Sequence, residues 1–136
     1  MPTGSPNSVL RLRKHADYQR VYTASRKQFS KQMSFFYALR TPDRRSDTPG
    51  PRIGLTVGKV MGKAHDRNRI KRRMRECIRH NAALLSGPVD VILHPRRTVL
   101  EMEFVKLERE IASVFRTVQS ALDKDARAAM PSDPTP

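Results

Sequence analysis

Apolar residues recur at helical spacing in two long segments of the chain. In residues 66–85 they fall within about a quarter turn of a helical wheel, at Ile70, Met74, Cys77, Ile78 and Leu85. Residues 100–122 repeat the pattern with Phe104, Leu107, Ile111, Val114, Phe115, Val118 and Leu122. Gly87 and Pro88 then form a strong stop signal for the first segment. The spacing predicts two amphipathic helices, each with one buried face.

Shorter apolar patterns predict strands and one further helix. In residues 52–57, Ile53, Leu55 and Val57 alternate with small residues, as expected for a half-buried strand. Further strands are predicted at residues 33–40 and 89–93 and, more briefly, at 60–61. Residues 15–23 are a predicted helix with Tyr18, Val21 and Tyr22 on one side. Residues 41–51 contain three prolines and are a predicted loop between two antiparallel strands.

These elements follow one another in the order αβββαβα. That order predicts an α+β fold in which helices pack on a small sheet. A length of 136 residues supports one domain with one modest core. We assign this domain to residues 9–123, because the polar residues 1–8 and the Ala-, Asp- and Pro-rich residues 124–136 predict disordered tails.

The charge balance of the chain predicts the kind of partner that it binds. The chain has 27 Lys and Arg against 13 Asp and Glu, a formal charge of +14 and a pI near 11.0, so a polyanion such as nucleic acid is the expected partner. A membrane is not expected, because Trp is absent and no apolar run approaches about 18 residues. The polar start of the chain lacks the apolar core of a secretory signal, which predicts a cytoplasmic protein.

The positive charge is concentrated on the first amphipathic helix. Opposite its apolar stripe lie Asn68, Lys71, Arg72, Arg75 and Arg79. Guanidinium groups donate paired hydrogen bonds to phosphate oxygens and stay charged at physiological pH. The alternative is a solvated face tied by intrahelical salt bridges, which is disfavoured because Asp66 and Glu76 are the only acids in this segment.

No arrangement of residues in the sequence predicts catalysis by the protein itself. The four histidines lack metal-ligand spacing, and the paired acids of a two-metal nuclease have no counterpart. The run from Gly54 to Lys59 has too few residues between its glycines for a nucleotide-binding loop. Cys77 lies on the apolar stripe, which favours a packed small side chain over a nucleophile. We therefore expect no catalytic residue and no dedicated metal site.

The motifs of residues 10–119 resemble those of the bacterial ribonuclease P protein subunit. The resemblance rests on the segment Arg52-Ile53-Gly54-Leu55-Thr56-Val57-Gly58-Lys59, followed by Arg67-Asn68-Arg69-Ile70-Lys71-Arg72 and Arg75, and on Leu12-Arg13-Lys14 with Asp17-Tyr18-Gln19-Arg20-Val21-Tyr22 upstream. The predicted element order is also the order of that family. The resemblance implies a left-handed strand–helix–strand crossover, against the usual right-handed rule.

The resemblance also implies partners and chemistry. In this family an RNA is the catalyst, and the protein helps it to recognise precursor tRNA and to bind Mg²⁺. We therefore expect one protein per RNA, with Mg²⁺ held by the RNA subunit and the substrate. The residues that match the motif facing the catalytic RNA are Arg67, Asn68, Arg69, Lys71, Arg72 and Arg75. Charge and fold class alone leave a ribosomal or other structural RNA-binding protein as the main alternative, and a protein-only endonuclease as a more distant one.

The second surface that the resemblance implies is a cleft for the single-stranded 5′ leader, on a different face from the basic helix. Tyr18 and Tyr22 stand where many members carry phenylalanine, Tyr37 falls at a third aromatic position, and Lys59 is a nearby cation. All three tyrosines of the chain are thus expected in one groove. The alternative, favoured by the residues alone, is ordinary core packing; aromatic platforms beside cations do bind single-stranded RNA.

Overall fold

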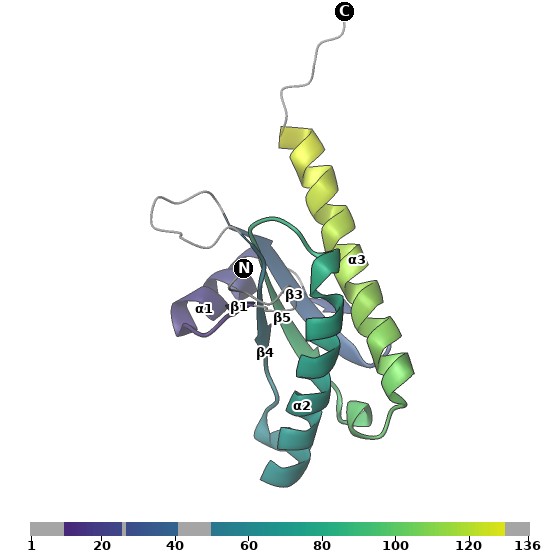
Figure 1. Ribbon diagram of the computed structural model, residues 1–136. Coiled ribbons are helices and arrows are strands. Elements are labelled where there is room, and N and C mark those ends of the chain that lie inside the picture. Colours follow the sequence, from purple (N-terminus) through teal and green to yellow (C-terminus); the bar gives the residue numbers. More distant parts are fainter. Residues whose placement is uncertain (1–9, 26, 41–49, 130–136) are drawn as a thin grey trace, which may run out of the picture.

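The computed structural model describes residues 10–25, 27–40 and 50–129 as one mixed sheet with helices on both faces (Figure 1). The sheet has the strand order β1-β4-β5-β3-β2, with α1 on one face and α2 and α3 on the other. The elements are β1 (Leu10–Arg11), α1 (His15–Ala24), β2 (Gln28–Phe29), β3 (Met33–Leu39), β4 (Arg52–Leu55), α2 (Ala64–Asn81), β5 (Val89–Pro95) and α3 (Phe104–Ala129). This architecture confirms the predicted α+β class.

The central strand β5 organises the sheet. It pairs antiparallel with β3, where Tyr37 is opposite Val91, and parallel with β4, where Ile53 is opposite Val91. β4, α2 and β5 therefore form the parallel strand–helix–strand crossover for which the resemblance implies a left hand. β3 and β4 run in opposite directions as predicted, but β5 lies between them, so they do not pair. The predicted loop between them lies mostly outside the described residues.

Several predicted boundaries differ from the structure. The strand predicted at residues 60–61 is wrong, because Lys59–Met61 is a single 3₁₀ turn in which Val60 is 91% exposed. α2 ends at Asn81 instead of residue 85, and a 3₁₀ turn at Ala82–Leu84 follows it. α3 continues to Ala129, beyond its predicted end at residue 122 and into the segment predicted as a tail. The edge strands β1 and β2 were not predicted, because two residues carry no periodicity.

The two faces of the sheet bury two separate clusters. β5 supplies both through its alternation: Val89, Val91 and Leu93 face α2 and α3, whereas Ile92 faces α1. The larger cluster includes the whole predicted stripe of α2, with Cys77 fully buried. Burial raises the pKa of the Cys77 thiol to about 12, which agrees with the predicted packing role. The smaller cluster, under α1, contains Leu12, Val21, Ala38 and Ile92.

One buried carboxylate fastens α1 to the sheet. Asp90 on β5 is 0% exposed and accepts hydrogen bonds from Arg20 of α1, from Arg40 at 2.6 Å and from Arg52 of β4 at 2.8 Å. Burial opposes ionisation of Asp90, but the hydrogen bonds from Arg52 and Arg40 outweigh it and hold its pKa below the usual value. Arg52 also pairs with Asp17 of α1 at 3.3 Å. Two strands, a helix and the residue that follows β3 thereby share one electrostatic centre.

Candidate nucleic-acid interface

The basic residues of α2 form a stripe beside its buried face. Because Ile70, Met74, Cys77 and Ile78 are buried against the sheet and α3, the side chains flanking them on one side must project past the sheet edge. This stripe consists of Asn68, Lys71, Arg72, Arg75 and Arg79, as predicted, and all five line one hollow of about 760 Å³. We call it the edge hollow, because its other wall is the β1–β4 edge of the sheet.

The edge hollow exists because β1 is so short. β1 pairs with β4 only at Arg52 and Ile53, and the last hydrogen bond joins the Leu12 amide to the Ile53 carbonyl at 3.0 Å. Beyond that point, Gly54 and Leu55 are at a free edge of β4. Ile53 and Leu55 line the floor of the hollow, and Tyr18 of α1 lines its side. The hollow is therefore continuous from the α2 face of the sheet to the edge of α1.

Tyr18 occupies that free edge. Its ring lies so close over Gly54 that a methyl group there would be 2.6 Å from Oη and 2.9 Å from Cζ. Burial raises the pKa of the Tyr18 phenol, and a hydrogen bond with the Leu55 backbone partly offsets that rise. The absent side chain of Gly54 is thus the reason that the ring can rest on β4. The sequence singled out Gly54 for its motif but gave no signal of this contact.

Tyr18 packs on the α1 face of the sheet and α2 packs on the other face, yet the two meet at the sheet edge. Both line the edge hollow, and Arg75 is near enough to Tyr18 for its positive charge to favour the phenolate. Burial lowers the pKa of Arg75, and the positive charge of Arg11 lowers it further. The sequence could not reveal this proximity, because Tyr18 and Arg75 meet only around the free edge of β4.

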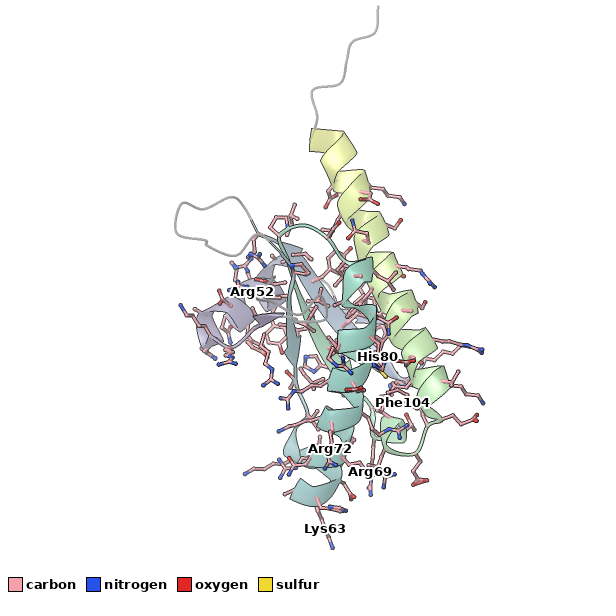
Figure 2. The ribbon with its side chains drawn as sticks, in the orientation of Figure 1. Arg52, Lys63, Arg69, Arg72, His80 and Phe104 are labelled. Atoms are coloured by element: carbon pink, nitrogen blue, oxygen red, sulfur yellow. The ribbon has the colours of Figure 1, made fainter. Side chains whose placement is uncertain are left out.

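The remaining motif residues lie outside the edge hollow. Arg67 is half-buried and its Nε donates to the Gly62 carbonyl at 3.2 Å, at the start of α2. Arg69 is exposed, and Figure 2 shows it with Arg72 on the same half of α2, away from Arg52 beside α1. The motif therefore divides into a hollow-lining group and the pair Arg67 and Arg69.

The predicted aromatic cleft is only partly assembled. Tyr22 contacts Tyr18, with ring centroids 6.3 Å apart, and Phe36 edge-on at 4.9 Å; its hydroxyl hydrogen-bonds His94 Nε2 at 3.0 Å. Tyr37, however, packs on the cluster under α2 and α3, on the opposite face of the sheet. The prediction that all three tyrosines converge is thus wrong, because neighbouring residues of a strand point to opposite faces.

Phe36 and His94 are the members of this group that sequence reasoning missed. Phe36 is next to Tyr37 and could have been found from the strand alternation once the face of α1 was known. His94 is half-buried, and burial lowers its pKa, with a smaller contribution from the charge of Lys27, which favours the neutral ring. Lys59 is exposed in its 3₁₀ turn and does not line the edge hollow. The aromatic group thus comprises Tyr18, Tyr22, Phe36 and His94.

The described residues contain neither a candidate metal site nor a candidate membrane-spanning helix. Among residues 10–25, 27–40 and 50–129, no group of three or more His, Cys, Asp or Glu side chains is placed to hold a metal ion. No helix in that part of the chain is long and apolar enough to span a membrane.

Comparisons with known proteins agree on one family. A sequence model of the family described as Ribonuclease P matches residues 7–119. The chain is 31% identical over 106 residues to the ribonuclease P protein component of Geobacillus kaustophilus, covering 78% of this chain and 84% of that protein. It is 33% identical over 108 residues to the protein of the same name from Desulforapulum autotrophicum, covering 79% and 87%.

Solved structures support the same conclusion. The RNase P protein of Staphylococcus aureus superimposes with a TM-score of 0.65 at 25% identity, covering 82% of this chain and 97% of that one. The RNase P protein of Thermotoga maritima, at 21% identity, shares the fold with a TM-score of 0.64 and coverages of 79% and 96%. With a family match across residues 7–119, this chain belongs to the bacterial ribonuclease P protein component family.

Proposed function

We propose that this protein binds the catalytic RNA of ribonuclease P and the 5′ leader of precursor tRNA, and so promotes removal of the leader to give the mature 5′ end. One protein would act with one RNA. The observation that carries the proposal is the edge hollow, in which an aromatic side chain and a row of cations share one concave surface. Single-stranded RNA binds such surfaces through base stacking and phosphate contacts.

The two kinds of side chain that line the edge hollow support separate tasks within this function. The stripe of α2 offers fixed cations to RNA phosphates, because its backbone is held by the buried stripe beneath it. Tyr18 offers a half-buried ring whose orientation is set by Gly54 and Leu55. The first surface suits a structured RNA, and the second suits unpaired bases.

Substitution of Tyr18 tests the assignment of the leader. In the holoenzyme, Tyr18→Ala should weaken the binding of precursor tRNA by about 1 to 3 kcal/mol, roughly 5- to 150-fold, as base–aromatic stacking does. Mature tRNA, which has no leader, should bind almost unchanged. Tyr18→Phe is the control: it keeps the ring and loses only the hydrogen bond with Leu55, so leader affinity should survive. Equal losses for both tRNAs would contradict the assignment.

The chemistry itself we assign to the RNA, with Mg²⁺ bound by that RNA and the substrate. The described residues supply no metal cluster. The isolated protein should therefore leave precursor tRNA intact in the presence of Mg²⁺, and cleavage should appear when the catalytic RNA is added. Cleavage by protein that has been treated with nuclease to remove RNA would overturn this part of the proposal.

A further inference from the structure

The edge hollow holds more positive charge than its own residues neutralise. Six cations line it: Arg11, Arg13, Lys71, Arg72, Arg75 and Arg79. Its one carboxylate, Glu76, is already paired with Arg79 at 2.5 Å and with His80 at 3.2 Å. Among the described residues, the other five cations have no carboxylate partner. Such a surface is complementary to an anion.

Two of these cations come from outside the basic helix. Arg11 and Arg13 flank Leu12, which is 3% exposed under α1 and whose amide is bonded to the Ile53 carbonyl at 3.0 Å. Because side chains alternate along an extended chain, burial of Leu12 on one face directs both arginines to the other, where they line the hollow. The fold thus sets the side of the chain from which these two exposed arginines project.

Arg11 and Arg75 approach the hollow from opposite walls. Both side chains line the hollow, and the pKa of Arg75 is lowered first by burial and then by the nearby positive charge of Arg11. A phosphate between them would turn that unfavourable proximity into two charge-assisted contacts. Tyr18 forms the neighbouring wall, so a base stacked on its ring would bring the attached phosphate into the same hollow.

We propose that Arg11 and Arg13 form, together with Arg75, a phosphate-binding site for the leader of precursor tRNA. The inference rests on the proposed function, and it adds to the RNA-binding surface Arg11 of β1 and Arg13, two residues further along the chain. It also joins the two surfaces that the family motif separates: the leader would pass around the free edge of β4, from the ring of Tyr18 to the stripe of α2.

The test is the double variant Arg11→Gln and Arg13→Gln in the reconstituted holoenzyme. The matched control is Arg109→Gln with Arg116→Gln, which removes the same charge from two exposed positions of α3 that do not line the hollow. Affinities for precursor and mature tRNA are measured over a range of salt concentrations. The first variant should lose about tenfold in affinity for precursor tRNA alone, and the slope of log affinity against log salt should flatten by about 0.7 per lost contact.

The control should bind both tRNAs nearly as the parent does. A second variant, Arg11→Lys with Arg13→Lys, keeps the charge and should retain the salt slope, which guards against misfolding as the cause. If the glutamine variant matches the control while Tyr18→Ala still loses leader affinity, the phosphate site is refuted and the proposed function stands. If neither the glutamine variant nor Tyr18→Ala loses leader affinity, the phosphate site and the proposed function are both refuted. If assembly with the catalytic RNA is weakened instead, the hollow holds that RNA and the inference is wrong.

Discussion

Position 54 should need glycine mainly because the ring of Tyr18 packs against it. The residue is in β4 and its backbone lies outside the left-handed region, so alanine fits the backbone without strain. A methyl group there would nevertheless be 2.6 Å from Tyr18 Oη and 3.2 Å from Cε2, well inside van der Waals contact. Gly54→Ala should therefore push the ring off the sheet.

The size of the effect follows from two opposing contributions. Overpacking of a buried contact costs about 1 to 3 kcal/mol. Replacing a strand glycine by alanine recovers roughly 0.5 to 1 kcal/mol. In the parent protein the first contribution dominates, and Gly54→Ala destabilises. With Tyr18→Ala the obstructing ring is gone, and the same substitution should be neutral or stabilising.

A double-mutant cycle checks this reversal. Urea unfolding of the parent, both single variants and the double variant, followed by far-UV circular dichroism, should give a coupling free energy of at least about 1 kcal/mol. In the holoenzyme, Gly54→Ala should also lower leader affinity as Tyr18→Ala does. Equal changes in the free energy of unfolding in both backgrounds would refute the contact as the reason for glycine at this position.

Two further predictions concern charge. Asp90→Asn leaves three arginines around a neutral group and should cost about 3 to 5 kcal/mol in urea unfolding. Because the pKa of Asp90 is lowered in the folded protein, its contribution to stability is present above the usual carboxyl pKa and is lost as pH falls below it. If the free energy of unfolding changed with acid pH in the same way in the parent and in Asp90→Asn, this prediction would be contradicted. Replacing Arg67 and Arg69 together by Ala should leave the fold intact and flatten the salt dependence of catalytic-RNA binding by about 0.7 to 0.9 per lost contact, whereas an unchanged slope and affinity would mark both as merely solvated.

The sequence by itself determined what depends on local periodicity. The buried stripe of α2 and the basic stripe beside it are set by residues three and four apart, so helical spacing was enough to predict both. The strands β3, β4 and β5 were predicted for the same reason, although their ends shifted by one or two residues. The charge of that stripe predicted a polyanion such as nucleic acid, and the family motifs then narrowed the prediction to the catalytic RNA.

Only the tertiary structure decided which residues share a surface. Tyr37 was assigned to the wrong face because a strand's alternation is visible in sequence, whereas the side on which α1 packs is not. Arg11, Arg13 and Arg75 meet because β1 stops after two residues and leaves the edge of β4 free, a result of sheet pairing between segments about 40 residues apart. Long-range pairing of this kind leaves no periodic trace in the sequence, and it is what creates the edge hollow.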